Sequence, residues 1–273
     1  MYVLWKGVGT IQGISVRNLS FSYNGGPLVL KDIDLDVSAG EFVCLLGQSG
    51  CGKSTFLRLV MGLEKPSAGE ILLNGRPIEG AGLDRGVVFQ DYGLFPWMTA
   101  GENIMLALRQ RYPKKDRKEL RQVAIERLRE VGLDDSVYRK LPKELSGGMN
   151  QRCAIAQAFG IEPSILLMDE PFGALDAVTR ARLQDLVLEL WAKEEHKKTV
   201  FFVTHDVDEA MLLANRIIVL GQSPSNVIYE CFIPADERPT RETQFDNPHV
   251  LRLRNELICQ INKDVALRIS PKA

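Results

Sequence analysis

The segment that most constrains the fold is a glycine-rich run placed between an apolar strand and a helix. Residues 47–54 read GQSGCGKS, which fits the pattern GxxxxGK followed by Ser or Thr. The preceding residues 41–46 (EFVCLL) are nearly all apolar, as in a strand buried on both faces. Residues 54–61 are predicted to form a helix that ends at Gly62. A strand, a glycine loop and a helix in this order begin a parallel α/β sheet.

The chemistry of this loop is the cradling of phosphate groups. Glycines let backbone N–H groups curve around phosphate oxygens, and the positive end of the helix dipole points at the same anion. Lys53 supplies a charge near the β and γ phosphates of a nucleotide, and the Ser54 hydroxyl can ligate Mg²⁺. A plain glycine turn is the alternative, but a chance match arises in about one such chain in a hundred. The predicted nucleotide-binding residues here are Gly47, Gln48, Ser49, Gly50, Cys51, Gly52, Lys53, Ser54 and Thr55.

An acidic pair follows a second buried strand pattern. Residues 164–168 (SILLM) lead directly into Asp169 and Glu170. Beside a phosphate-binding loop, Asp169 is predicted to hold Mg²⁺, and Glu170 to polarise the attacking water or accept its proton. A helix cap or a surface pair of carboxylates is the structural alternative. Kinases, GTPases, helicases and transport ATPases all share the glycine loop, so other residues must select among them.

Strand and helix patterns alternate along the rest of the chain, around a helical middle third. Strand-like runs occupy residues 14–23, 33–37, 199–203 and 216–220. Residues 99–132 are rich in helix formers, and an apolar stripe runs along Ala124, Leu128 and Val131. The pattern predicts an α/β core interrupted by a helical lobe at about residues 91–160.

A second helix of this lobe is predicted to begin at a segment that carries a family resemblance. Residues 145–152 (LSGGMNQR) resemble the signature sequence of ABC ATPases. Ser146, Gly147 and Gly148 stand at the helix N-terminus, which offers donors to a phosphate. The resemblance implies that ATP is sandwiched between the P-loop of one protomer and the signature of its mate. A helix cap is the alternative for a lone serine–glycine–glycine run.

Four further positions match the same family in order. The resemblance implies that Tyr23 stacks on adenine, although a tyrosine ending a strand is as often a core residue. It implies that Gln90 reaches Mg²⁺ and the attacking water. It also implies that Asp176 belongs to a loop crossing the dimer interface and that His205 contacts the γ-phosphate. The implied catalytic residues are therefore Glu170, His205 and Gln90, and the implied Mg²⁺ ligands are Ser54, Gln90 and Asp169.

The resemblance covers about residues 14–220 and implies a fold class. We expect a P-loop NTPase (RecA-like) α/β core with an antiparallel β subdomain and an inserted α-helical subdomain. The expected ABC ATPase domain spans residues 12–223, followed by a short C-terminal extension at 224–273. The extension follows no pattern that we can assign, and it is too short for the accessory β-domain that sugar-importer ATPases append.

The segment around Gln90 narrows the resemblance to importers. Residues 85–97 (RGVVFQDYGLFPW) are similar to the nitrate, taurine and aliphatic sulfonate importer ATPases, and residues 78–82 and 171–180 are similar to the taurine type. The implied function is ATP hydrolysis for uptake of taurine or another aliphatic sulfonate, with nitrate, cyanate or a pyrimidine precursor as alternatives. Phe95 and Trp97 are predicted to line a groove for a coupling helix of the membrane subunit. Packing inside the helical lobe is the alternative.

Composition limits the partners. The net charge of -1 argues against a nucleic-acid binder that works through a broad basic field. The basic stretch at residues 109–121 could touch lipid headgroups, but it is more typical of a solvated helix face. The five dispersed cysteines fit reduced thiols in the cytosol. No apolar run approaches the roughly 20 residues of a membrane span, and the N-terminus lacks the pattern of a signal peptide.

We therefore expect a peripheral protein at the cytoplasmic face of the inner membrane. It would pair as a homodimer, or with a second ATPase subunit, and bind permease subunits fed by an extracytoplasmic solute-binding protein. The alternatives are a soluble ABC ATPase of the repair or translation kind, or an exporter. The former usually carry two ATPase modules or long coiled-coil insertions, and exporters are often fused to membrane helices.

Cys51 provides a separate expectation. A thiol at a helix N-terminus beside Lys53 is expected to have a lowered pKa. Alkylation is then predicted to inhibit hydrolysis, and ATP to protect against it. A buried, inert thiol is the alternative.

Overall fold

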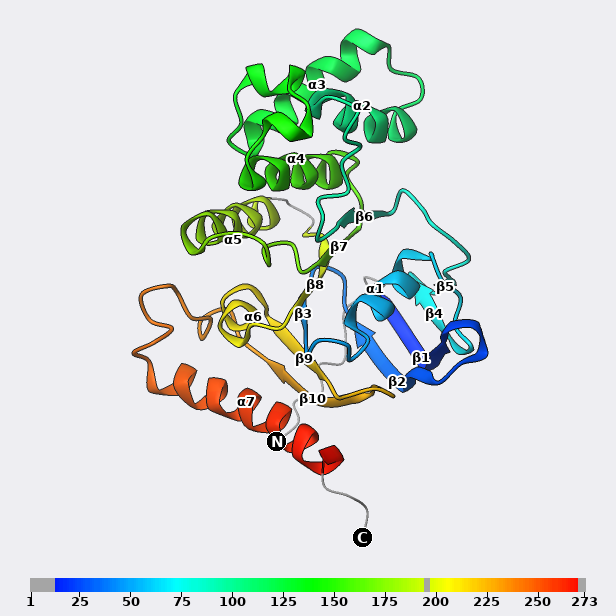
Figure 1. The fold of residues 1–273 in the computed structure, drawn as a ribbon, viewed down its shortest axis with the longest axis vertical. Coiled ribbons are helices and arrows are strands. Elements are labelled where there is room, and N and C mark those ends of the chain that lie inside the picture. The colour runs from blue at the N-terminus through cyan, green and yellow to red at the C-terminus, as the bar shows by residue number, and fades with distance from the viewer. Residues whose placement is uncertain (1–12, 194–196, 270–273) are drawn as a thin grey trace.

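The computed structural model describes residues 13–193 and 197–269, which form two sheets with helices around them (Figure 1). One sheet is antiparallel, with its strands in the order β2-β1-β4-β5. These strands are β1 (Ile14–Ser22), β2 (Leu28–Val37), β4 (Ala68–Leu73) and β5 (Arg76–Pro77). β2 begins before the predicted residues 33–37. The prediction missed its first part because the alternation is interrupted at Asp32, which has φ 48°. The backbone N–H of Asp32 donates to the Ser20 hydroxyl instead of to a backbone carbonyl of the neighbouring strand.

The second sheet has six strands in the order β10-β9-β3-β8-β7-β6. All neighbours are parallel except β10, which runs antiparallel to β9. Its strands are β3 (Phe42–Leu46), β6 (Arg85–Val88), β7 (Ile165–Asp169), β8 (Thr199–Thr204), β9 (Arg216–Leu220) and β10 (Val227–Phe232). Because the carboxyl ends of parallel strands meet at one edge, the segments after β3, β7 and β8 lie close together.

The six-stranded sheet separates two hydrophobic cores. Alternate residues of β3 show this: Val43 and Leu45 belong to one cluster with α1 (Lys53–Met61) and the antiparallel sheet. Phe42 and Cys44 belong to the other cluster, with the remaining helices. This arrangement confirms the predicted α/β core with an antiparallel β subdomain and an inserted helical subdomain.

The inserted helices form the lobe at the top of Figure 1. They are α2 (Ala100–Arg111), α3 (Arg117–Glu130) and α4 (Gly147–Gly160), with the short 3₁₀ turns η2 (Asp135–Arg139) and η3 (Pro142–Glu144) between them. Thr99 and Asp116 begin α2 and α3 with capping boxes, which fix where both helices start. Regular helix in the lobe therefore starts at Ala100. The domain limits 12–223 and 224–273 stay a prediction.

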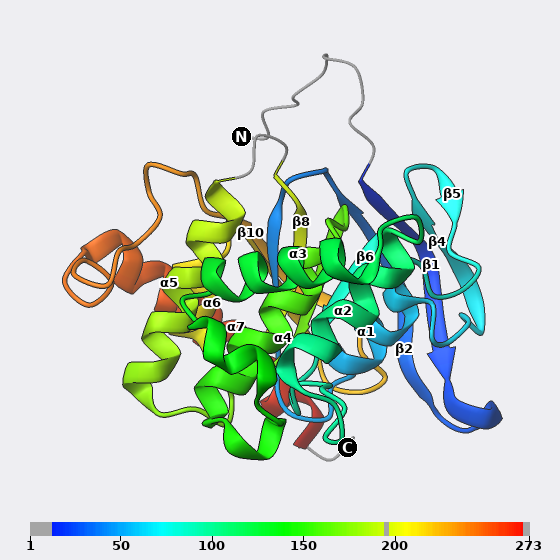
Figure 2. The same cartoon turned by 90° about the horizontal axis from the view of Figure 1, so that it is seen from above.

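The remaining helices cover the sheet on the side away from α1. They are α5 (Ala177–Ala192), α6 (Val207–Leu213) and the C-terminal α7 (Pro248–Ile269). Figure 2 shows the antiparallel sheet on one side of the molecule and the segment that leads into α7 on the other. None of the helices within the described residues is long and apolar enough to cross a bilayer.

Candidate functional site

The glycine loop leaves β3 in the middle of the sheet and enters α1. Gly50 (φ 80°) and Gly52 (φ 101°) lie in the left-handed region, where a side chain would be strained. A Cβ on Gly47 would come within 2.8 Å of the Leu220 carbonyl oxygen. The loop is therefore closed tightly against β9, and its backbone faces the carboxyl edge of the sheet.

Lys53 is buried, with 4% of its surface exposed, and it folds back over the loop. Its Nζ donates to the carbonyl oxygens of Gly47 and Gln48, at 2.8 and 2.9 Å. The same nitrogen lies 3.9 Å from Glu170 Oε1. The ammonium group is thus held between the glycine loop and the acidic end of β7.

Ser54 and Asp169 meet across the gap between α1 and β7. The Ser54 hydroxyl donates to Asp169 Oδ1 at 2.9 Å. Burial raises the pKa of Asp169, and the hydrogen bond from Ser54 opposes that rise. A half-buried carboxylate beside a hydroxyl is a donor set of oxygens, which suits a hard cation such as Mg²⁺.

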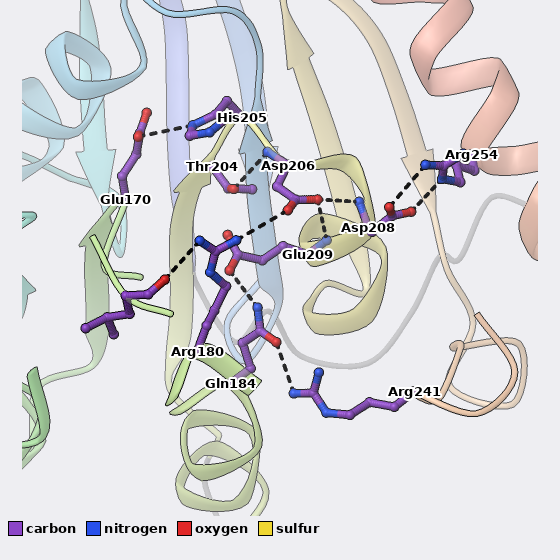
Figure 3. Close-up of polar contacts among 11 residues, drawn as sticks. Glu170, Arg180, Gln184, Thr204, His205, Asp206, Asp208, Glu209, Arg241 and Arg254 are labelled. Atoms are coloured by element: carbon purple, nitrogen blue, oxygen red, sulfur yellow. Dashed lines mark hydrogen bonds and ion pairs between the residues drawn. The ribbon is translucent and has the colours of Figure 1, made fainter. Parts of the chain in front are cut away.

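Glu170 stands between Lys53 and His205. Its backbone is in the left-handed region (φ 43°), and its N–H donates to the Val203 carbonyl at 3.1 Å. That bond ties the turn after β7 to β8. Glu170 Oε2 lies 3.2 Å from His205 Nδ1, and the imidazole is 57% exposed (Figure 3). The predicted carboxylate and histidine therefore face each other at the sheet edge.

Two further predicted residues lie on other elements: Tyr23 contacts the first turn of α1, and Gln90 follows β6. The Tyr23 hydroxyl lies 3.2 Å from Thr55 Oγ1, and its ring meets Phe21 edge-on at 4.7 Å between centroids. Tyr23 is 39% exposed, so it is partly accessible to solvent beside the loop. Gln90 comes two residues after β6, next to β7, and its side chain is exposed.

Ser146, Gly147 and Gly148 lie elsewhere. They begin α4, and Ser146 Oγ accepts the Met149 N–H at 3.3 Å, as a helix cap does. α4 belongs to the core on the opposite face of the sheet from α1. A Cβ on Gly148 would lie 2.6 Å from the Thr179 side chain, so this segment packs on the first turn of α5. Within the described residues, no hydrogen bond or ion pair joins this signature segment to the glycine loop.

Asp176 caps α5 beside that segment. Its carboxylate accepts the N–H groups of Val178 and Thr179, at 3.1 and 2.9 Å. These two backbone bonds lower the pKa of Asp176. Asp176 and Ser146 thus form a second polar group, on adjacent helix starts.

The expectation of an acidic Cys51 thiol is wrong. Cys51 is 2% exposed and packs under the loop with the antiparallel-sheet core. Burial raises its pKa more than the nearby charge of Lys53 lowers it.

The segment after Gln90 was predicted either to line a groove or to pack inside the helical lobe. Trp97 is 74% exposed and Phe95 40% exposed, so Trp97 is not a core residue of the lobe.

A polar network behind His205 was missed by the sequence reasoning. Asp206 caps α6 through the N–H groups of Asp208 and Glu209. Glu209 is buried and accepts the Gln184 side-chain N–H at 2.7 Å. The spacing from Asp206 to Glu209 resembles the start of a capping box, which is the signal that could have indicated this helix start.

Comparison with known proteins places the chain in a family. The model for the family described as ABC transporter matches residues 30–173. The nitrate import ATP-binding protein NrtD of Synechococcus elongatus is 46% identical over 85% of this chain and 85% of its own length. The bicarbonate transport ATP-binding protein CmpD of the same species is 44% identical, over 88% and 87% of the two chains.

A solved structure agrees. The dimeric, post-hydrolysis structure of the ATP-binding cassette MJ0796 bound to ADP and phosphate has 33% identity and a TM-score of 0.72. The match covers 81% of this chain and 99% of that one. The family model and the relatives span the glycine loop, the acidic strand end and the helical lobe described above. The chain therefore belongs to the ABC transporter family and is an ATP hydrolase of that family.

Proposed function

We propose that the chain is the ATP-hydrolysing subunit of an importer for a small anion, acting as a pair beneath a membrane permease. One observation carries the proposal: Lys53, Asp169 and Glu170 converge at a single sheet edge, with Ser54 and His205 as their partners. Phosphoryl transfer to water needs this set, because it requires charge for the phosphates, ligands for a cation and a carboxylate for the water.

Each of these residues has a role in the proposed reaction. Lys53 exchanges its two carbonyl acceptors for oxygens of the β and γ phosphates. Glu170 accepts a proton from water as the water oxygen bonds to the γ-phosphorus. The bond to the β,γ-bridging oxygen breaks, which releases ADP and phosphate. His205 holds Glu170 and contacts the γ-phosphate, and the partly exposed Tyr23 stacks on adenine.

The residues around Ser54 fit the Mg²⁺ that this family of reactions uses. The half-buried carboxylate of Asp169, whose charged form is disfavoured by partial burial, would gain a counter-charge when a cation binds. We assign Ser54, Asp169 and Gln90 as its ligands. Bound Mg²⁺ supplies charge neutralisation on the phosphate oxygens.

The proposed pairing of two subunits is supported by the placement of the two polar groups on different elements. The glycine loop packs against β9, whereas the start of α4 packs on the first turn of α5, so the two groups lie on different elements of the chain. In the proposed dimer, Ser146, Gly147 and Gly148 bind the phosphates of ATP held by the mate, and Asp176 lies at the interface. The dimeric form of the related cassette supports this arrangement.

The permease contact is proposed at Phe95 and Trp97. Their rings lie 5.4 Å apart, and both are exposed at the junction of β6 and the helical lobe. Exposed aromatic pairs of this kind are unfavourable in water and typical of contact surfaces. A coupling helix laid against them would connect the membrane subunit to Gln90.

The solute is proposed from relatives, because this subunit does not touch it. Residues 78–82 and 171–180 are similar to the taurine type, whereas the relatives found carry nitrate and bicarbonate transport names. We therefore place nitrate first, with bicarbonate and taurine next. All three are small species that carry a single negative charge or an anionic group.

The test is uptake of labelled nitrate, bicarbonate and taurine in native cells, with this chain intact or carrying Lys53→Ala. We expect the variant to abolish uptake of one anion and leave the other two unchanged. The exposed Lys65→Ala serves as the matched control. Uptake of all three anions at the level of the unaltered strain would contradict the importer proposal.

A further inference from the structure

The C-terminal segment reaches the helix that follows His205. α6 has only seven residues, and a helix this short is not stable on its own, so tertiary contacts must fix its position. Its first turn carries two carboxylates, Asp208 and Glu209. Both are connected to arginines of the C-terminal segment, one directly and one through a glutamine (Figure 3).

The direct connection is the pair between Arg254 and Asp208. Arg254 Nε lies 2.6 Å from Asp208 Oδ1, and Nη2 lies 3.2 Å from Oδ2, so the contact is bidentate. Arg254 lies on the face of α7 that also buries Val250 and Leu257, at a spacing of four and three residues. The guanidinium is therefore aimed at α6 by the packing of the whole helix.

The indirect connection runs from Arg241 through α5. Arg241 Nη2 donates to Gln184 Oε1 at 3.0 Å and to the Ala181 carbonyl at 2.6 Å. Gln184 in turn donates to the buried Glu209 at 2.7 Å. The amide of Gln184 is thus oriented by Arg241 so that its N–H faces Glu209.

The position of His205 depends on where α6 begins. His205 occupies the single position between the end of β8 and the helix cap Asp206. The Asp206 N–H donates to Thr204 Oγ1 at 3.0 Å, which tightens this turn. A small cavity of about 40 Å³ lies beside it, lined by Glu170, His205 and Glu209 among others, so the imidazole has room to move if α6 shifts.

We propose that Arg254 and Arg241 are positioning residues for ATP hydrolysis, which fix α6 and thereby hold His205 against Glu170. This inference rests on the proposed function of His205. It gives the C-terminal extension a role in the chemistry, although the extension touches neither Glu170 nor His205 through a hydrogen bond or an ion pair in the described part of the chain. The effect is expected on turnover, because a displaced contact to the transferring group costs rate more than binding.

The experiment uses the full chain with Arg254→Gln, Arg254→Lys and Arg241→Gln, and with Arg252→Gln as the matched control on the exposed face of α7. We measure kcat and KM for MgATP, the thermal midpoint, and the imidazole NMR resonances of His205. The chain has three histidines, so His205→Asn assigns the signal. We expect Arg254→Gln to lower kcat about tenfold and to change KM less than about twofold. Arg254→Lys keeps the charge but loses the bidentate geometry of the guanidinium, so its kcat should lie between those of the unaltered chain and Arg254→Gln.

The resonance of His205 is expected to move in Arg254→Gln and in Arg241→Gln, and to stay in place in Arg252→Gln. Unchanged kcat and an unmoved resonance in Arg254→Gln would overturn the inference. So would a fall in kcat that tracks a loss of folded protein in the thermal scan. If the unaltered chain does not hydrolyse ATP, or Glu170→Gln hydrolyses it equally well, the proposed function fails. The imidazole resonance still decides the positioning inference in that case, because it requires no turnover.

Discussion

At the scale of single residues, Glu170 is the group on which hydrolysis should depend most. It lies between the buried ammonium group of Lys53 and the imidazole of His205. Its backbone adopts a left-handed conformation, which the hydrogen bond from its N–H to Val203 of β8 fixes. Non-glycine residues in that conformation are uncommon and concentrate at functional positions. The strained turn after β7 therefore favours a functional role for Glu170, in addition to its place in the acidic pair.

Replacing Glu170 by glutamine removes the proton acceptor and keeps the shape of the side chain. We expect hydrolysis to fall by about 10²- to 10⁴-fold, with ATP affinity largely retained. Single-turnover hydrolysis and equilibrium nucleotide binding measure the two quantities separately. Glu79→Gln, at an exposed position, should match the unaltered chain. A Glu170→Gln protein that hydrolyses ATP at the original rate would remove this residue from the reaction.

Cys51 should be chemically inert in the folded chain. Its burial raises the pKa of the thiol, so little thiolate is present at neutral pH, and the sulfur is shielded. Cys259 is exposed on α7 and provides the internal comparison. With iodoacetamide at pH 7.5, mass spectrometry should find Cys259 modified well before Cys51, with or without ATP. Equal labelling of the two sites would contradict the buried placement of Cys51.

At the scale of elements, α6 and its neighbours should give stability a particular pH dependence. Burial raises the pKa of Glu209 above its ordinary 4.5, outweighing the hydrogen bonds from Thr204 and Gln184. The folded chain therefore holds this proton more tightly than the unfolded chain. Stability contributed by that proton is present below pH 4.5 and is lost as pH rises through the folded pKa.

Glu209→Gln cannot ionise and so removes this dependence. The free energy of unfolding of the unaltered chain minus that of Glu209→Gln should fall as pH rises above 4.5. Urea unfolding at a series of pH values from 4.5 upward gives this difference. Taking the difference cancels the titration of groups that both proteins share. A difference that stays constant or grows with pH would contradict the raised pKa.

The junction between β6 and the helical lobe should carry the permease contact. Trp97→Ala removes the most exposed large aromatic ring of this segment, 74% exposed, without touching the glycine loop. We expect permease binding and uptake to fall while ATP binding by the isolated chain stays unchanged. Co-purification with the permease and a nucleotide-binding titration test the two parts. Leu63→Ala, at another exposed apolar side chain, is the control. Intact assembly of the Trp97→Ala chain would refute the contact.

At the scale of the whole molecule, the proposed function predicts that the glycine loop of one chain and the start of α4 of another bind the same nucleotide. The Glu170→Gln chain with MgATP should run as a dimer in light scattering, because in the proposed arrangement the nucleotide would lie between two protomers and would not be consumed. Adding Ser146→Arg should return it to a monomer, since a bulky cation replaces the cap beside the phosphate position. A Ser136→Arg change at an exposed position of η2 is the control. A monomer in every case would contradict the sandwich arrangement.

The sequence alone determined the parts of this protein that are set by contiguous residues. The glycine loop, the acidic end of β7 and the cap of α4 follow from requirements that are local: left-handed glycines, a continuous apolar strand and helix-start donors. Their order along the chain was enough to indicate the fold class, because parallel strands bring the segments that follow them to one edge.

The tertiary structure alone decided how distant segments use those parts. It buried Cys51, because the antiparallel sheet closes over the loop from the other side, and it left Trp97 exposed, because the lobe packs through other residues. It also brought Arg254 to Asp208 and Arg241 to Gln184, pairs separated by 46 and 57 residues. No local pattern encodes such pairs, since each depends on where whole elements pack against one another. The role proposed for the C-terminal extension therefore depends on the packing of α7 against α6.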